Sequence, residues 1–224
     1  MTPCFGNDLI TAFGRVRLKL RRGNPKNWGI ARVFTPCPTL TPMTTAIAFQ
    51  GPDFAILGAD SQVTDGDKRI LSPSTPKIVK LGKYLLAVRG DCRPGDILTY
   101  NWKPPAFDGT DPVKFIGKKI VPAIIATFRA NGYDFDKDGA SFGFLMAFAG
   151  NVFEIGDDLS INQSADGLYA IGSGSAYALG ALAGQLPNLA NPEWATDRIL
   201  EALAISAKYD INTAAPFQIE VQRV

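Results

Sequence analysis

TPMTTAIAFQGPDFAILGADSQVTDG, residues 41–66, holds two apolar runs on either side of a Gly-Pro-Asp turn. The runs 44–50 and 54–60 have the length and the apolar content of buried strands, and GPD is a turn sequence. We therefore predict a β-hairpin centred on Pro52. In that hairpin Thr44 lies opposite Asp60, because each is eight residues from the centre.

A second hairpin follows in KIVKL (77–81) and YLLAVRG (84–90), with Gly82 and Lys83 at the turn. Its pairing places Lys77 opposite Val88 and close to Gly90. The two hairpins together predict that Thr44 lies near Asp60 and that Lys77 lies near Gly90, all at strand ends.

The rest of the chain alternates between helices and strands. The long helical stretch has Asp111 as its cap, Pro112 in its first turn, Gly132 as its stop, and Pro122 at an expected kink. The other predicted elements are a helix over 93–103, a hairpin over 140–158, a strand entering a helix over 168–184, a helix over 192–208 and a last strand over 217–222. This order fits an α+β fold in which antiparallel sheets carry paired helices on their outer faces.

Composition bounds the class of protein. The 224 residues, 46% of them hydrophobic, suffice for one large domain, and no apolar stretch is long enough to span a membrane. Three cysteines (Cys4, Cys37 and Cys92) without metal-ligand spacing favour a reducing, cytoplasmic location. The chain has no histidine, which excludes histidine-based triads and histidine zinc sites. A catalytic base would therefore be a carboxylate, a lysine or a free α-amine.

Residues 1–43 differ from the rest of the chain. Residues 1–42 hold seven basic side chains and one acidic one, which leaves 16 of the 23 basic and 20 of the 21 acidic residues for the remainder. Three prolines (Pro36, Pro38 and Pro42) oppose regular structure before Met43. VRLKL (16–20) alternates like a strand and could bind an acidic partner, but it lacks an aromatic platform, so we do not expect nucleic-acid binding. We divide the chain into a basic propeptide or upstream extension, 1–43, and one domain, 44–224.

Two further stretches suggest ligands that we do not expect. DFDKDG (134–139) matches the first half of a calcium-binding EF-hand loop, but Leu145 stands where that loop requires a bidentate glutamate. The glycine-rich stretch 171–184 lacks the lysine of a phosphate-binding loop. A serine held at the start of its helix could still serve catalysis. We expect neither a cofactor nor a metal.

Thr44 has a chemical use if it is the first residue of the working protein. It then carries a hydroxyl nucleophile and an α-amine, whose pKa of about 7.7–8.0 lets it act as a base near neutrality. Asp60 and Lys77 would form a buried ion pair beside the hydroxyl, and the lysine charge would favour a lower hydroxyl pKa. The Gly90 amide could stabilise the oxyanion.

From Met43 to its C-terminus the chain resembles proteasome β-subunits and the bacterial proteasome-like peptidase that works with an unfoldase ATPase. The matching stretches, in family order, are TTAIAFQGPDFAILGADSQVT, KIVKLGKYLLAVRGDCRPGD, YAIGSGSAYALGALAG and AKYDINTAAPFQIEVQ. The resemblance implies an N-terminal-nucleophile hydrolase with a four-layer αββα sandwich.

The resemblance also implies roles for single residues. Thr44 resembles the nucleophile, Asp60 and Lys77 its charged partners, and Gly90 the oxyanion donor. Ser173, Asp210 and Thr213 resemble the polar group around the α-amine. The residues that resemble the substrate-binding positions are Thr64, Gly90 and Cys92, which pair with an extended peptide, and Val88 and Cys92, which line the specificity pocket.

The chain departs from the family pattern at three places. Lys77 comes one residue later than usual, which implies a one-residue shift in SPSTP (72–76), and Arg89 replaces a small residue. Met43 stands where self-processing subunits have glycine. Two routes to a free Thr44 stay open: an aminopeptidase removes Met43 as an initiator, or Thr44 attacks the Met43 carbonyl and releases residues 1–43.

The expected function is a threonine-type endopeptidase in a ring-shaped, homo-oligomeric chamber. It would act on peptides or unfolded proteins, and an ATP-dependent unfoldase or other cap is a possible partner. Two alternatives remain: a non-catalytic structural subunit of the same fold, and an amidase or acylase that acts on small amides.

Overall fold

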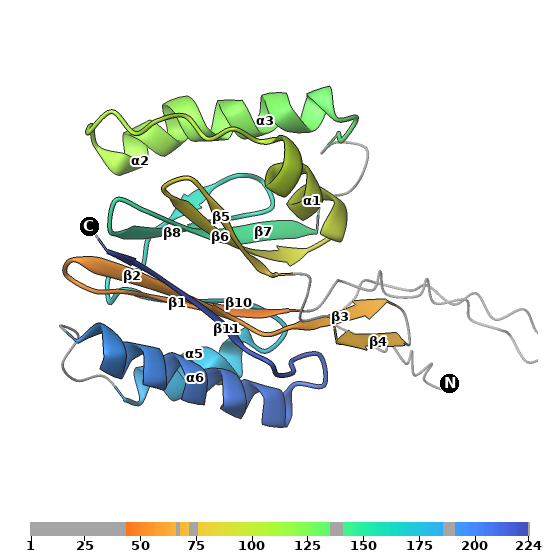
Figure 1. The fold of residues 1–224 in the computed structure, drawn as a ribbon, viewed down its shortest axis with the longest axis vertical. Helices are drawn as coiled ribbons and strands as arrows, with labels where there is room; N and C mark the ends of the chain where they lie inside the picture. The colour runs from red at the N-terminus through yellow and green to blue at the C-terminus, as the bar shows by residue number, and fades with distance from the viewer. Residues whose placement is uncertain (1–43, 66–67, 72–75, 135–140, 186–190, 224) are drawn as a thin grey trace, which may run out of the picture. The chain divides into compact units, whose positions relative to one another are not determined.

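The computed structural model describes residues 44–65, 68–71, 76–134, 141–185 and 191–223. The basic segment 1–43 and all but the first residue of the acidic loop 134–139 lie outside this part, as do most of residues 72–76. The described residues form two main antiparallel sheets (Figure 1). One contains, in order, β10 (Leu168–Gly172), β1 (Thr45–Gln50), β2 (Phe54–Ala59) and β11 (Gln218–Arg223). The other contains β5 (Ile78–Leu81), β6 (Tyr84–Gly90), β7 (Phe142–Phe148), β8 (Asn151–Ile155) and β9 (Ile161–Asn162).

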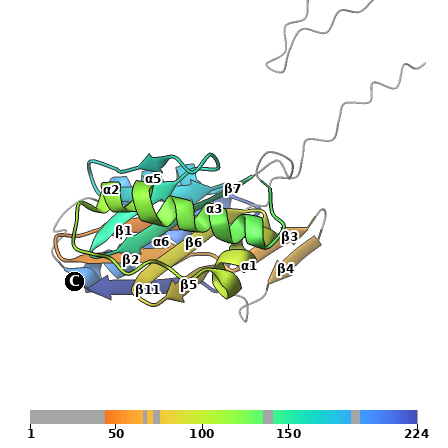
Figure 2. The ribbon, with the colours of Figure 1, turned by 90° about the horizontal axis from the view of Figure 1, so that it is seen from above.

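Helices lie on the outer faces of both sheets. Figure 1 shows α5 (Ser175–Ala183) and α6 (Pro192–Tyr209) beside the four-stranded sheet, and α1 (Cys92–Asn101) and α3 (Val121–Ala130) beside the five-stranded sheet. Figure 2 shows α3 lying over the strands of the five-stranded sheet. A short hairpin of β3 (Gln62–Asp65) and β4 (Lys68–Leu71) continues from the end of β2. The predicted mixture of helices and antiparallel strands is confirmed.

Three apolar clusters hold these elements together. The cluster between the sheets is rich in small side chains, such as Ala46, Ala48 and Ala87. Large aromatic side chains, among them Phe128 and Phe144, fill the space between the five-stranded sheet and its helices. A third cluster, which includes Phe49 and Ile199, lies under α5 and α6. Burial of this apolar surface is the main force that stabilises the layers.

The first hairpin forms, but its predicted register is wrong by one residue. Ala46 pairs with Ala59, and the Asp60 amide donates to the Thr45 carbonyl (3.1 Å), so Thr45 rather than Thr44 lies opposite Asp60. The reason is the turn, in which Gly51 N donates to Phe54 O (2.8 Å). The tip therefore holds two residues, and the centre of the hairpin lies between Pro52 and Asp53 instead of on Pro52.

The second hairpin has the predicted register. Ile78 pairs with Ala87, and Val88 N donates to Lys77 O (3.3 Å). The third hairpin, the strand that enters α5, and the last helix and strand are confirmed as well.

The long helical stretch differs from its prediction around Pro122. Asp111 caps it through Lys114 N (2.9 Å), but it divides into α2 (Pro112–Phe115), a π-helical turn η1 (Ile116–Ile120) and α3. A proline nitrogen cannot donate to the preceding turn, and here a widened π turn comes just before it.

Candidate active site

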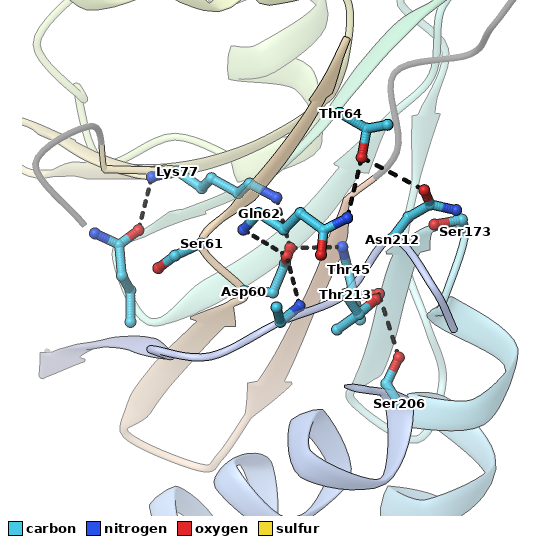
Figure 3. A network of polar contacts seen from close by, with 12 residues as sticks. Thr45, Asp60, Ser61, Gln62, Thr64, Lys77, Ser173, Ser206, Asn212 and Thr213 are labelled. Atoms are coloured by element: carbon cyan, nitrogen blue, oxygen red, sulfur yellow. Dashed lines mark hydrogen bonds and ion pairs between the residues drawn. The ribbon is translucent and has the colours of Figure 1, made fainter. Parts of the chain in front are cut away.

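A network of buried polar side chains lies where β1 begins, β2 ends and β5 begins (Figure 3). Thr44 immediately precedes β1 and is 7% exposed. Thr45, the first residue of β1, pairs with Gly172 of β10. Buried polar side chains need hydrogen-bond partners, and this network supplies them.

Asp60 is the centre of the network. Its Oδ1 accepts hydrogen bonds from Thr45 N (2.9 Å) and Lys77 Nζ (2.6 Å). Its Oδ2 accepts from Gln62 N (2.9 Å) and Ala214 N (3.2 Å). The residue is fully buried, so these four donors replace water around the carboxylate. With its acceptor positions filled by these donors, Asp60 is suited to hold its partners in place rather than to act as a catalytic base.

Lys77 is the cation of this site. Burial lowers the pKa of Lys77 below its usual 10.5, against the opposing effect of the Asp60 charge and hydrogen bond. A negative charge on Asp210, or on Cys92 as a thiolate, acts in the same direction as Asp60 and raises the pKa of Lys77. The structure thus brings the Lys77 ammonium within electrostatic reach of Asp60, Asp210 and Cys92.

Asp210 is the second carboxylate of the site and directly follows α6. Its Oδ2 accepts from Ser173 Oγ (2.7 Å) and Thr213 Oγ1 (2.6 Å), and its Oδ1 accepts from Asn212 N (3.2 Å). The residue is 8% exposed. Within the described part of the chain, no lysine or arginine forms an ion pair with it. Ser173, Asp210 and Thr213 therefore lie together, as the resemblance implies.

Thr45 joins the two carboxylate networks. Its amide binds Asp60, and its hydroxyl lies 2.6 Å from Thr213 Oγ1. Because Thr213 donates its one hydroxyl proton to Asp210, the Thr45 hydroxyl is the donor between the two threonines. The residue that follows Thr44 is thus held by both its backbone and its side chain.

Close packing against Gly174 confines these hydroxyl groups. A β-carbon at position 174 would lie 2.1 Å from Ser206 Oγ, 2.2 Å from Thr45 Oγ1 and 2.8 Å from Thr213 Oγ1. Ser206 also donates to the Gly174 carbonyl (3.0 Å). Any larger residue would displace the hydroxyl groups, so glycine is required here.

Gly90 ends β6 in a conformation that favours glycine. Its φ is +90°, and a β-carbon there would lie 1.7 Å from the Ser141 carbonyl oxygen. Ser141 O also accepts from Asp91 N (2.8 Å). The bend at Gly90 leads directly into α1, whose first residue is the exposed Cys92.

The other predicted substrate-binding residues lie on neighbouring elements. Thr64, in β3, accepts from Gln62 Nε2 (3.1 Å). An open depression of about 560 Å³ lies beside Cys92 and is lined by Asp91, Cys92, Arg93, Gly132 and Tyr133. Val88 lies against α1, where a β-carbon on Gly95 would lie 3.3 Å from its Cγ2.

Several members of the network were not predicted from the sequence. Thr45, Gln62 and Ala214 act through backbone amides, Thr45 and Ser206 through hydroxyls, and Gln62 also through its side-chain amide. None of these groups has a sequence signature. The one available signal was the pair of adjacent threonines, Thr44 and Thr45, at the start of an otherwise apolar run.

The described residues contain no group of three or more histidine, cysteine, aspartate or glutamate side chains that could hold a metal ion. In the same part of the chain, no helix has the length and apolarity needed to cross a membrane.

The fold matches solved structures over nearly their whole length. Thiobacillus denitrificans BPH has a TM-score of 0.64 and 20% identity, over 80% of this chain and 98% of that chain. The same protein in complex with epoxomicin has a TM-score of 0.63 and 20% identity, over the same shares. Eukaryotic HslV from Trypanosoma brucei has a TM-score of 0.60 and 19% identity, over 81% of this chain and 100% of that chain.

These likenesses show that the chain has a proteasome-like fold, as the sequence resemblance implies. No protein-family model and no curated protein sequence matches the chain.

Proposed function

We propose that this chain with a proteasome-like fold is a threonine-type endopeptidase whose nucleophile is the Thr44 hydroxyl. In this proposal the two sheets and their outer helices are the four-layer αββα sandwich of the N-terminal-nucleophile hydrolases. The observation that carries the proposal is the double contact of Asp60, which binds both the Thr45 amide (2.9 Å) and the Lys77 ammonium (2.6 Å). One buried carboxylate thereby fixes a cation beside the peptide bond that joins Thr44 to Thr45.

The base of the reaction is the α-amine of Thr44, exposed when the chain before it is removed. The chain has no histidine, Asp60 is occupied by four donors, and Lys77 is held in an ion pair. A free α-amine is uncharged in part near neutral pH and can accept a proton. Asp210, with Ser173 and Thr213, supplies the negative partner that would orient this amine.

The proposed reaction proceeds through an ester. The α-amine takes the Thr44 hydroxyl proton, Oγ1 bonds to the substrate carbonyl carbon, and the Gly90 N–H stabilises the oxyanion. The carbon–nitrogen bond then breaks, and the proton passes to the leaving amine. Water next attacks the ester, gives one proton to the α-amine, and releases the acid as Oγ1 regains its proton. The Lys77 charge favours the deprotonated hydroxyl throughout.

The substrate is an extended peptide or an unfolded protein. Backbone pairing with Thr64, Gly90 and Cys92 is the expected binding mode, and Val88 and Cys92 are the proposed specificity residues. We further propose a homo-oligomeric ring in the cytoplasm, with an ATP-dependent unfoldase or other cap as a partner. The two routes to a free Thr44, removal of Met43 or self-cleavage after it, both stay within the proposal.

The test is peptide hydrolysis by matched Thr44 variants. Thr44→Ala removes the hydroxyl and should abolish hydrolysis, whereas Thr44→Ser keeps the hydroxyl and the amine and should retain measurable activity. Equal activity in wild type and Thr44→Ala would overturn the proposal. A sizing column on the same samples distinguishes a ring from a monomer or dimer.

A further inference from the structure

Gln218, the first residue of β11, reaches across from one main sheet to the other. Its Oε1 accepts hydrogen bonds from Lys77 N (2.6 Å) and Ile78 N (3.3 Å). β11 and β5 are edge strands of different sheets, and they contact each other here. The Gln218 side-chain oxygen thus accepts hydrogen bonds that a further strand, paired to the edge of β5, would otherwise accept.

The backbone of Lys77 is held at both its amide and its carbonyl. The Lys77 amide donates to Gln218, and the Lys77 carbonyl accepts from Val88 N (3.3 Å). Lys77 is only 7% exposed, so its amide would lose its partner without replacement by bulk water if Gln218 were removed. With the backbone held, the side chain reaches Asp60 Oδ1 at 2.6 Å.

We propose that Gln218 is a positioning residue that sets the Lys77 ammonium against Asp60 in the active site. The inference rests on the proposed function, since it gives Gln218 its effect on catalysis through Lys77. The contact with Gln218 also accounts for how Lys77 can come one residue later in the sequence than in the family that the chain resembles. The lysine is anchored from β11, so its place does not depend solely on the spacing of the preceding loop.

Gln222 provides a matched control. It lies four residues further along β11, on the same face of the strand, because side chains alternate. Its Nε2 donates to Lys83 O (2.7 Å), so it bridges the same two sheets. The contact lies at the β5–β6 turn, at the opposite end of β5 from Lys77. Gln218→Leu and Gln222→Leu therefore each remove one bridge between the sheets, and only the first touches Lys77.

The experiment compares full-length wild type, Gln218→Leu and Gln222→Leu by peptide hydrolysis over a series of pH values. We expect Gln218→Leu to lower kcat by about 10- to 100-fold with little change in KM, the scale of a small displacement in an active site. Gln222→Leu should keep the wild-type kcat, although both variants lower Tm. Hydrogen exchange of the Lys77 and Ile78 amides should accelerate in Gln218→Leu alone.

A conservative variant gives a second readout. Gln218→Glu keeps an oxygen that accepts from both amides, so it should restore most of the kcat that Gln218→Leu loses. Its added negative charge favours protonated Lys77, so the alkaline fall of activity should move to higher pH. A protein that merely lost sheet stability would show neither the recovery nor the shift.

The outcomes separate the two proposals. If wild type hydrolyses peptides through Thr44 but Gln218→Leu matches Gln222→Leu in kcat and in exchange, the role of Gln218 is wrong and the proposed function stands. If wild type is inactive, or if Thr44→Ala stays active, the proposed function falls and the catalytic role of Gln218 falls with it.

Discussion

Asp60 and Asp210 are two buried carboxylates of one site, and they are satisfied in opposite ways. Asp60 binds an ammonium and three backbone amides, from Lys77, Thr45, Gln62 and Ala214. Asp210 binds two side-chain hydroxyls and the Asn212 amide, and no ion pair to it occurs within the described residues. The charge of Asp60 is balanced inside the folded chain, whereas that of Asp210 is only hydrogen-bonded.

This difference suits the two carboxylates to different roles. A buried anion that already has its cation is a fixed part of the framework, and its removal leaves an unpaired charge. An anion with oriented hydroxyl donors and no bonded cation is suited to receive one. In our proposal that cation is the ammonium form of the Thr44 amine. Thr45 contacts both hydrogen-bond networks and so holds them in place relative to each other.

The largest effect is expected from breaking the balanced pair. Lys77→Met leaves the Asp60 carboxylate buried without its cation, so the free energy of unfolding should fall by about 3–5 kcal/mol. Peptide hydrolysis should fall by about 10²- to 10³-fold, the scale for loss of one electrostatic stabiliser. Chemical denaturation and steady-state kinetics measure the two effects.

The double variant Asp60→Asn/Lys77→Met is the control for this prediction. It removes both charges, so it should recover part of the stability and none of the activity. A double variant that is no more stable than Lys77→Met would contradict the description of Asp60 as a carboxylate balanced by the lysine.

A smaller effect is expected at the other carboxylate. Asp210→Asn removes the charge proposed to hold the Thr44 amine and should lower kcat by about 10- to 100-fold, as for one hydrogen bond to a charged group. Stability should fall by less than in Lys77→Met, because no bonded cation is left unpaired. Asp197→Asn, an exposed change on α6, is the matched control and should leave kcat unchanged.

The smallest effect concerns pH. Burial lowers the pKa of Lys77 below 10.5, and the proposed mechanism needs the protonated lysine. Activity should therefore fall as pH rises through a midpoint below 10.5. Lys77→Arg keeps its charge at all practical pH values, so whatever activity it retains should lack this alkaline fall. If the alkaline fall of activity is unchanged in Lys77→Arg, the titration of another group causes it.

The sequence was sufficient to predict most of the helices and strands, because apolar runs, turns and caps are local signals. Asp111 with Pro112, and the Gly-Pro-Asp turn, mark their elements without help from the rest of the chain. The register of the first hairpin was missed because residue types do not distinguish a turn centred on Pro52 from one centred beside it. Hydrogen bonding between Gly51 and Phe54 decides that choice.

The site was predictable only in part for a similar reason. Asp60, Lys77 and Asp210 are charged residues at the ends of predicted elements, so pattern and resemblance could single them out. Gln218 and Ser206 are ordinary residues in a strand and a helix. Their contacts join segments more than thirty residues apart, and only the packed sheets bring those segments together.

In our proposal Thr44, with a free α-amine, is the nucleophile. The most direct measurement is the mass and N-terminal residue of the purified, active protein, before and after treatment with a hydroxyl-reactive inhibitor. Our account predicts an active chain that begins at Thr44 and an adduct that maps to Thr44 and is absent in Thr44→Ala. Full activity in a chain that still carries Met43, or an adduct on any other residue, would contradict it.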